Sequence, residues 1–228
     1  MDADGEGRLL PQAGGLDRIE GVDRLRTGAL AAMLGIPFGG VFARLLGDTI
    51  PSRRQRRYEE FVKAISHALR VLEGRIEEAR ISSDEFADMV EDVEERLQTR
   101  RAGEMRDYYA AAIGNALTPE RPDPTEQERM LATLGDLRPA HLWLLRLVEA
   151  TTEGPRDMYA GGVYEVIAWK APDADLEAVK RDWADLARHD LVQANPLTTT
   201  HSPGDLRRRL TPFGTRFLAF VTLPPTGT

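Results

Sequence analysis

Apolar residues recur every three or four positions through most of the chain, which is the spacing that gives an α-helix one apolar face. The first clear stripe begins after Tyr58 and consists of Phe61, Ile65, Leu69, Leu72 and Ile76. A second stripe follows the capping-box pattern Ser82-x-x-Glu85 and consists of Phe86, Val90, Val93 and Leu97. Both stripes predict long helices that pack together in a bundle.

Three further helices are predicted between residues 105 and 150. The first ends before Thr118-Pro119, and its apolar positions are Met105, Tyr108, Tyr109, Ala112, Ile113, Ala116 and Leu117. Thr125-x-x-Glu128 is typical of the start of the next helix, and Pro139 is expected in the first turn of the one after it. The short connections between these helices favour antiparallel neighbours.

The C-terminal part of the chain predicts a winged-helix-like unit. Asp175 is the expected N-cap of one helix, and residues 163–169 fit either a short helix or a strand. An extended stretch at 191–194, a loop at 195–204 and a returning strand at 206–210 would form a small β-hairpin. Thr211 and Pro212 then supply the N-cap and first residue of a last helix. The predicted fold class is therefore mainly α, a helical bundle followed by a winged-helix-like unit.

These patterns divide the chain into a flexible N-terminal tail (1–25), a helical bundle (26–124) and a winged-helix-like C-terminal domain (125–228). Inside the bundle, residues 27–43 carry no charge, and a cluster of basic residues follows at Arg53, Arg54, Arg56 and Arg57. The uncharged run is shorter than the about 20 apolar residues that cross a bilayer, and Pro37 interrupts it.

Two interpretations of residues 27–43 stay open. The favoured one is a helical hairpin buried in the bundle. In the other, the segment inserts into a membrane or lies on it, with the arginine cluster against anionic headgroups.

Composition and charge exclude several functional classes. The 228 residues include no cysteine, which excludes disulfides, thiolate nucleophiles and cysteine-ligated zinc. A net charge of -7 disfavours sequence-independent binding to nucleic acid, because such binding needs clustered positive charge. The first residues are acidic where a secretory signal would be basic and then apolar. A cytoplasmic location is therefore predicted, with attachment to the membrane periphery as the alternative.

No residue pattern in the chain identifies a chemical reaction. The histidines are dispersed and form no metal-ligand pair; they are His67, His141, His189 and His201. Carboxylates on the predicted helices fall on outward faces, where a solvated surface is expected. We therefore predict no catalytic residue, metal, cofactor or small-molecule ligand. Besides the arginine cluster above, the candidate contacts with an anionic surface or nucleic acid are Arg207, Arg208 and Arg209.

Four segments follow, in order, the pattern of a known bacterial family. Residues 105–120 (MRDYYAAAIGNALTPE) and 134–145 (LGDLRPAHLWLL) match its aromatic helix and its proline-led helix. Residues 186–192 (LARHDLV) and 210–217 (LTPFGTRF) match its last two motifs, with Asp190 where the pattern has glycine. Together they resemble the abortive-infection alpha family, which is associated with phage exclusion. The resemblance implies a role in defence and names no reaction or site residue.

The sequence thus predicts a non-catalytic bacterial protein that acts through contacts with a protein partner or with itself, in an abortive-infection response. One alternative is a membrane-active effector that uses residues 27–43 and the arginine cluster. The other is a winged-helix DNA-binding regulator. It is the weakest of the three because the helix that would read DNA, over residues 175–190, is net acidic.

Overall fold

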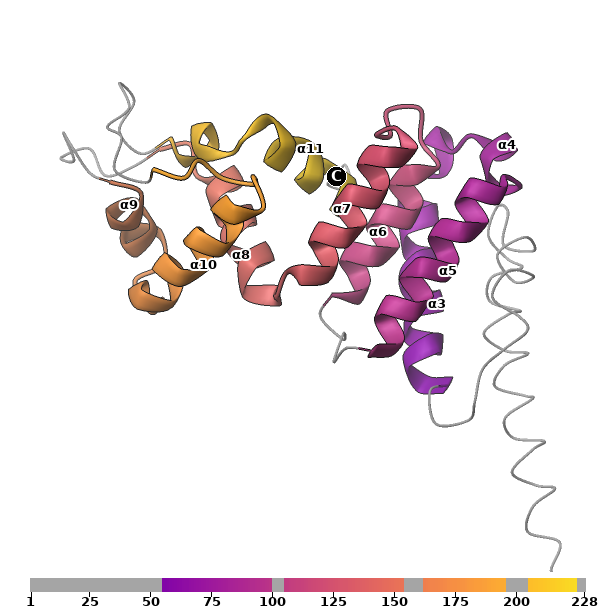
Figure 1. The fold of residues 1–228 in the computed structure, drawn as a ribbon, viewed down its shortest axis with the longest axis horizontal. Helices are drawn as coiled ribbons and strands as arrows, with labels where there is room; N and C mark the ends of the chain where they lie inside the picture. Colours follow the sequence, from indigo (N-terminus) through magenta and orange to yellow (C-terminus); the bar gives the residue numbers. More distant parts are fainter. Residues whose placement is uncertain (1–54, 100–104, 154–161, 196–204, 225–228) are drawn as a thin grey trace, which may run out of the picture.

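The computed structural model describes residues 55–99, 105–153, 162–195 and 205–224, which form helices and no strand (Figure 1). The first five α-helices are α3 (Gln55–Val71), α4 (Glu78–Ile81), α5 (Asp84–Thr99), α6 (Arg106–Ala116) and α7 (Pro124–Asp136). The later ones are α8 (Pro139–Ala150), α9 (Val163–Lys170), α10 (Leu176–Arg188) and α11 (Pro212–Val221). Two 3₁₀ helices are η1 (Glu73–Arg75) and η2 (Leu206–Arg209). The predicted mainly helical class is confirmed.

Helix α6 occupies the centre of the first group of helices, with α3, α5, α7 and α11 packed around it. Its sequence RDYYAAAIGNA is rich in small residues, and every residue from 109 to 116 is buried. Small side chains let neighbouring helix backbones approach closely, and a helix buried on all sides needs no polar face. Helix α3 packs on α6, and the residues Phe61, Ile65 and Leu69 of the α3 stripe are buried in the same core.

Four of the predicted helix starts can be compared with the structure. Pro139 opens α8, and the Asp175 side chain caps α10 by accepting hydrogen bonds from the Glu177 and Ala178 amides, as predicted. The other two starts are shifted. Ser83, rather than Ser82, accepts a hydrogen bond at the start of α5, and Asp123 caps α7 two residues before Thr125. Proline at position 124 fits the first turn of a helix, so the preceding aspartate becomes the cap.

The predicted β-hairpin does not form in the described residues. Residues 206–210, predicted to be a strand, include the 3₁₀ helix η2, and the pairing is reduced to one antiparallel bridge between Val192 and Leu210. The backbone groups bond elsewhere, since the Leu206 amide donates to the Thr151 carbonyl at the end of α8. Residues 163–169, which fitted either a helix or a strand, lie in α9. The described residues therefore do not contain the paired strands that form the wing of a winged helix.

The N-terminal end of α11 is fitted tightly against the segment that follows α10. The Thr211 hydroxyl accepts a hydrogen bond from the Gly214 amide at 2.8 Å, as an N-cap does, and the Thr211 amide donates to the Leu191 carbonyl at 3.1 Å. A Cβ on Gly214 would lie 2.0 Å from that same Leu191 oxygen. Because no real Cβ approaches an oxygen so closely, only glycine fits here.

The C-terminal end of α11 is held by Asn115 of α6. This side chain is buried, and its Nδ2 lies 2.9–3.1 Å from three carbonyl oxygens, those of Ala219, Phe220 and Thr222. These carbonyls belong to the last turn of the helix, where no further turn supplies an N–H donor. Helix α11 therefore connects α6 to the segment after α10. Figure 1 shows it crossing between the first group of helices, α3 to α7, and a second group, α8 to α10.

Helix α10 ends in a Schellman motif at Asp190. The Leu191 amide donates to the Leu186 carbonyl and the Asp190 amide donates to the Ala187 carbonyl, both at 3.0 Å. Asp190 has a φ of 59°, the left-handed conformation that favours glycine. This is the position at which the family pattern has glycine and this chain has aspartate.

A pair of substitutions at Asp190 tests this conformation. We expect Asp190→Gly to be more stable than Asp190→Ala by about 1 kcal/mol, because only the alanine variant has a Cβ that disfavours the left-handed region. Both variants lose the exposed carboxylate, so its ion pair with Arg129 cancels from the comparison. Urea unfolding measures the difference, and equal stabilities would contradict the left-handed assignment.

Candidate functional site

Only part of the set of arginines predicted as contacts lies within the described residues. Arg53 and Arg54 lie outside the described residues, and Arg56 and Arg57 belong to the first turn of α3. Arg207 and Arg208 are exposed, and their Nε atoms donate to the Glu149 carbonyl and to the Asp205 carboxylate.

The prediction that Arg209 contacts an anionic surface or nucleic acid is wrong, because its side chain is buried. It is 4% exposed, its Nη1 lies 3.4 Å from the Gln193 Oε1, and burial lowers its pKa from the ordinary value. The reason is the 3₁₀ conformation of η2, in which residues three apart share a side, so that Arg209 lies on the buried side with Leu206. In a strand, Arg209 would share a face with Arg207. A continuous basic stripe therefore does not exist at residues 207–209.

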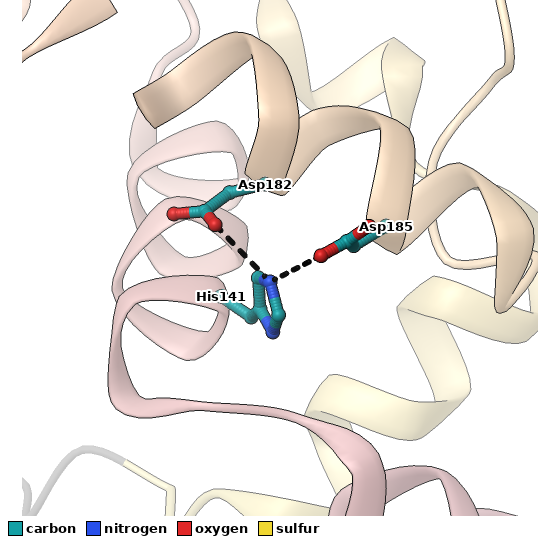
Figure 2. A group of neighbouring side chains, drawn as sticks. All are labelled: His141, Asp182 and Asp185. Atoms are coloured by element: carbon teal, nitrogen blue, oxygen red, sulfur yellow. Dashed lines mark ion pairs between the residues drawn. The ribbon is translucent and has the colours of Figure 1, made fainter. Parts of the chain in front are cut away.

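A cluster that the sequence did not predict lies between α8 and α10. His141, in the first turn of α8, points toward Asp182 and Asp185, which are three positions apart on the facing side of α10 (Figure 2). The His141 Nε2 lies 3.3 Å from the Asp182 Oδ1 and 3.5 Å from the Asp185 Oδ2. The histidine is 3% exposed. Within the described residues this trio is the one group whose composition and spacing suit a metal ion.

The hydrogen bond from the Arg138 backbone amide assigns the proton of the neutral His141 ring to Nε2, a nitrogen that also lies 3.1 Å from the Arg138 Nη2. The Arg138 backbone amide donates to Nδ1 at 3.1 Å, so Nδ1 must present its lone pair. In the neutral ring the proton then sits on Nε2 and points at the two aspartates. A metal ion bound at Nε2 would need that lone pair and would move the proton to Nδ1, directly against the Arg138 N–H. The capping hydrogen bond therefore opposes metal binding, although the donor types fit.

Arginine side chains already neutralise both carboxylates. The Arg138 Nη2 lies 2.7 Å from the Asp182 Oδ1 and 3.4 Å from the Asp185 Oδ2, and Arg188 also pairs with Asp185. A cation would have to displace these guanidinium groups. General-base catalysis is equally disfavoured, since both ring nitrogens of His141 are occupied by protein groups and neither is left for a substrate. The cluster is best described as a hydrogen-bonded joint between α8 and α10.

The sequence contains two patterns that belong to this joint, although its histidines are far apart along the chain. Asp182-x-x-Asp185 places two carboxylates on one face of a helix, and His141 stands three residues after Arg138, at the third position of α8. Each pattern alone is compatible with a solvated surface. Only the packing of α10 on α8 shows that the two patterns face each other.

A hollow with a volume of about 710 Å³ lies where the α6–α7 connection meets α11. Its charges are largely satisfied by neighbours: Arg75 pairs with Glu120, and Arg216 pairs with Glu126. Arginines and carboxylates are equally represented in its lining, so no ligand charge is favoured.

Comparison of the chain with protein-family models, with curated proteins and with solved structures gave no match. The resemblance to the abortive-infection alpha family therefore stays a prediction from its motifs. Among the described helices, none combines the length and apolar character needed to cross a lipid bilayer. The uncharged run at 27–43 lies outside the described residues.

The joint makes stability depend on pH through His141. Burial lowers the pKa of His141 in the folded chain, and Arg138 and His189 act in the same direction, while Asp182 opposes them. The unfolded chain therefore binds a proton more readily than the folded chain. The stabilisation is complete above the ordinary histidine pKa of 6.5 and is lost as the pH falls below it.

We expect His141→Gln to remove this part of the pH dependence. Glutamine does not titrate, and its side-chain oxygen can still accept the Arg138 amide hydrogen bond, as in a capping box. The measurement is the free energy of unfolding in urea at about pH 7.5 and about pH 5.5. His67→Gln, at an exposed position of α3, is the matched control. If His141→Gln and the wild type lose equal stability on acidification, His141 is not the titrating group.

Proposed function

We propose that this chain is a non-catalytic bacterial protein that acts in the cytoplasm through protein contacts, in an abortive-infection response. The role in defence rests on the ordered motifs. Two of them now have a structural reason: the glycine of LTPFG has no room for a Cβ, and the position of the expected glycine near residue 190 is left-handed. These are constraints of the backbone, which a shared fold would impose on any relative.

The observation that supports a contact function is a pair of exposed tryptophans. Among the described residues, Trp143 on α8 and Trp169 at the end of α9 are the large apolar side chains left exposed, by 44% and 49%. Trp143 stands two residues after His141, so it faces away from α10, whereas the neighbouring Leu142 and Leu144 are buried. Tryptophan is among the residues enriched in the energetic hot spots near the centres of protein interfaces.

Two further observations support a contact function. The one buried histidine among the described residues is used to join two helices, and the described core is continuous across both groups of helices. A rigid helical scaffold that presents exposed aromatic side chains is suited to recognition.

The test is a phage-plating assay in bacteria that express the chain. We expect expression to reduce plaque formation and the double variant Trp143→Ala, Trp169→Ala to lose at least tenfold of that protection, because loss of an interface hot spot costs about 2 kcal/mol or more. Exposed positions tolerate substitution, so the variant should keep its unfolding midpoint. Chemical cross-linking in the same cells should show a complex that the variant no longer forms.

The matched control is Arg146→Ala with Glu165→Ala, which changes exposed residues of the same two helices without changing the net charge. It should protect and cross-link as the wild type does. Protection that survives the loss of both tryptophans would overturn the assignment of the contact surface. A chain that neither protects nor forms a complex would overturn the proposed function itself.

A further inference from the structure

We propose that the groove between α5 and α7 binds a lysine- or arginine-rich segment of a partner protein. This inference rests on the proposed contact function and names the chemistry of one partner. The groove has a volume of about 430 Å³ and lies on the first group of helices, apart from the two exposed tryptophans on α8 and α9.

The floor of the groove is apolar. Three side chains that belong to the core reach its surface here, namely Phe86 and Met89 from α5 and Leu131 from α7. Each is less than 9% exposed, so together they present a narrow strip of apolar surface rather than a broad apolar patch. A strip of this kind suits the aliphatic stem of a lysine or arginine, which packs on apolar surface while its charged end stays in water.

The rim of the groove is acidic. Four carboxylates line it, Glu85, Asp88, Asp92 and Glu128. The two arginines of the lining are already engaged, since Arg96 pairs with Asp92 at 2.8 Å and Arg80 pairs with Glu77 at 2.7 Å. Within the described residues, Glu85, Asp88 and Glu128 form no ion pair. Three carboxylates are thus left to attract a positively charged partner.

The spacing of these carboxylates fits an extended or helical segment and does not fit a single ion. Asp88 and Asp92 lie three and seven positions after Glu85 on α5, which is about 4.5 Å and about 10.5 Å along the helix axis. The groups of described residues close enough to hold a metal ion do not include them. Carboxylates spread along a groove match several basic side chains of one chain.

The probe is a fluorescein-labelled helical peptide of about 14 residues, which spans about 21 Å, built from alanine, leucine and lysine with the lysines on one face. We expect the full chain to bind it, with an affinity that falls as salt is raised. The triple variant Glu85→Gln, Asp88→Asn, Glu128→Gln should bind about tenfold more weakly, since it loses three partly exposed ion pairs. Fluorescence anisotropy measures the affinity, and hydrogen exchange should show protection of α5 and α7.

The matched control is Glu78→Gln, Glu91→Gln, Glu95→Gln, which removes three exposed carboxylates that do not line the groove. It changes the net charge by the same amount and should bind as the wild type does. Equal weakening in both triple variants, or equal binding of a peptide with glutamate in place of lysine, would overturn the proposal. So would a groove variant that alters only sedimentation of the chain with itself, since the occupant would then be a second copy.

The two proposals fail separately. If the peptide does not bind while the tryptophan variants still lose phage protection, the groove is wrong and the contact function stands. If the peptide binds while the intact chain gives no protection and no cross-linked complex, the groove stands without the role in defence.

Discussion

The close approach of Gly214 to the Leu191 carbonyl is the contact on which the arrangement of the helices depends. It lets α11 begin against the segment that leaves α10, where a Cβ would lie 2.0 Å from that oxygen. The Asn115 side chain then holds the far end of the same helix to α6. One ten-residue helix thus connects both groups of helices, and the surfaces proposed for recognition are carried on either side of it.

The periodic part of the sequence predicted most of the helices, because burial of one face determines both the spacing of apolar residues and the packing. The starts at Thr211 and Pro139 were predicted correctly. Those at Ser82 and Thr125 were shifted, because a nearby residue, Ser83 or Asp123, accepts the capping hydrogen bond instead. The strand expected at residues 206–210 failed for a reason that local pattern cannot show. The Leu206 and Arg207 amides bond instead to the carbonyl of Thr151, the residue after α8, which is distant in the sequence.

The site was the less predictable part, because its chemistry arises from two helices that meet in space. No metal ion was predicted, and the structure shows a histidine and two aspartates close enough to suggest one. The Arg138 amide bonded to Nδ1 of His141 opposes a metal ion there, and no sequence motif encodes this capping hydrogen bond. The exposed tryptophans illustrate the same limit, since Trp183 has a similar helical setting and is buried.

Native-state hydrogen exchange of Gly214→Ala tests the central claim that α11 connects the two groups of helices. Gly74→Ala is the reference, because a Cβ at Gly74 would meet nothing within 4 Å. If α11 couples the groups, the substitution lowers the free energy of exchange in α6 and in α10 together by about 1–3 kcal/mol, the usual cost of overpacking. Loss of protection confined to the first turn of α11, with α6 and α10 unchanged, would contradict it.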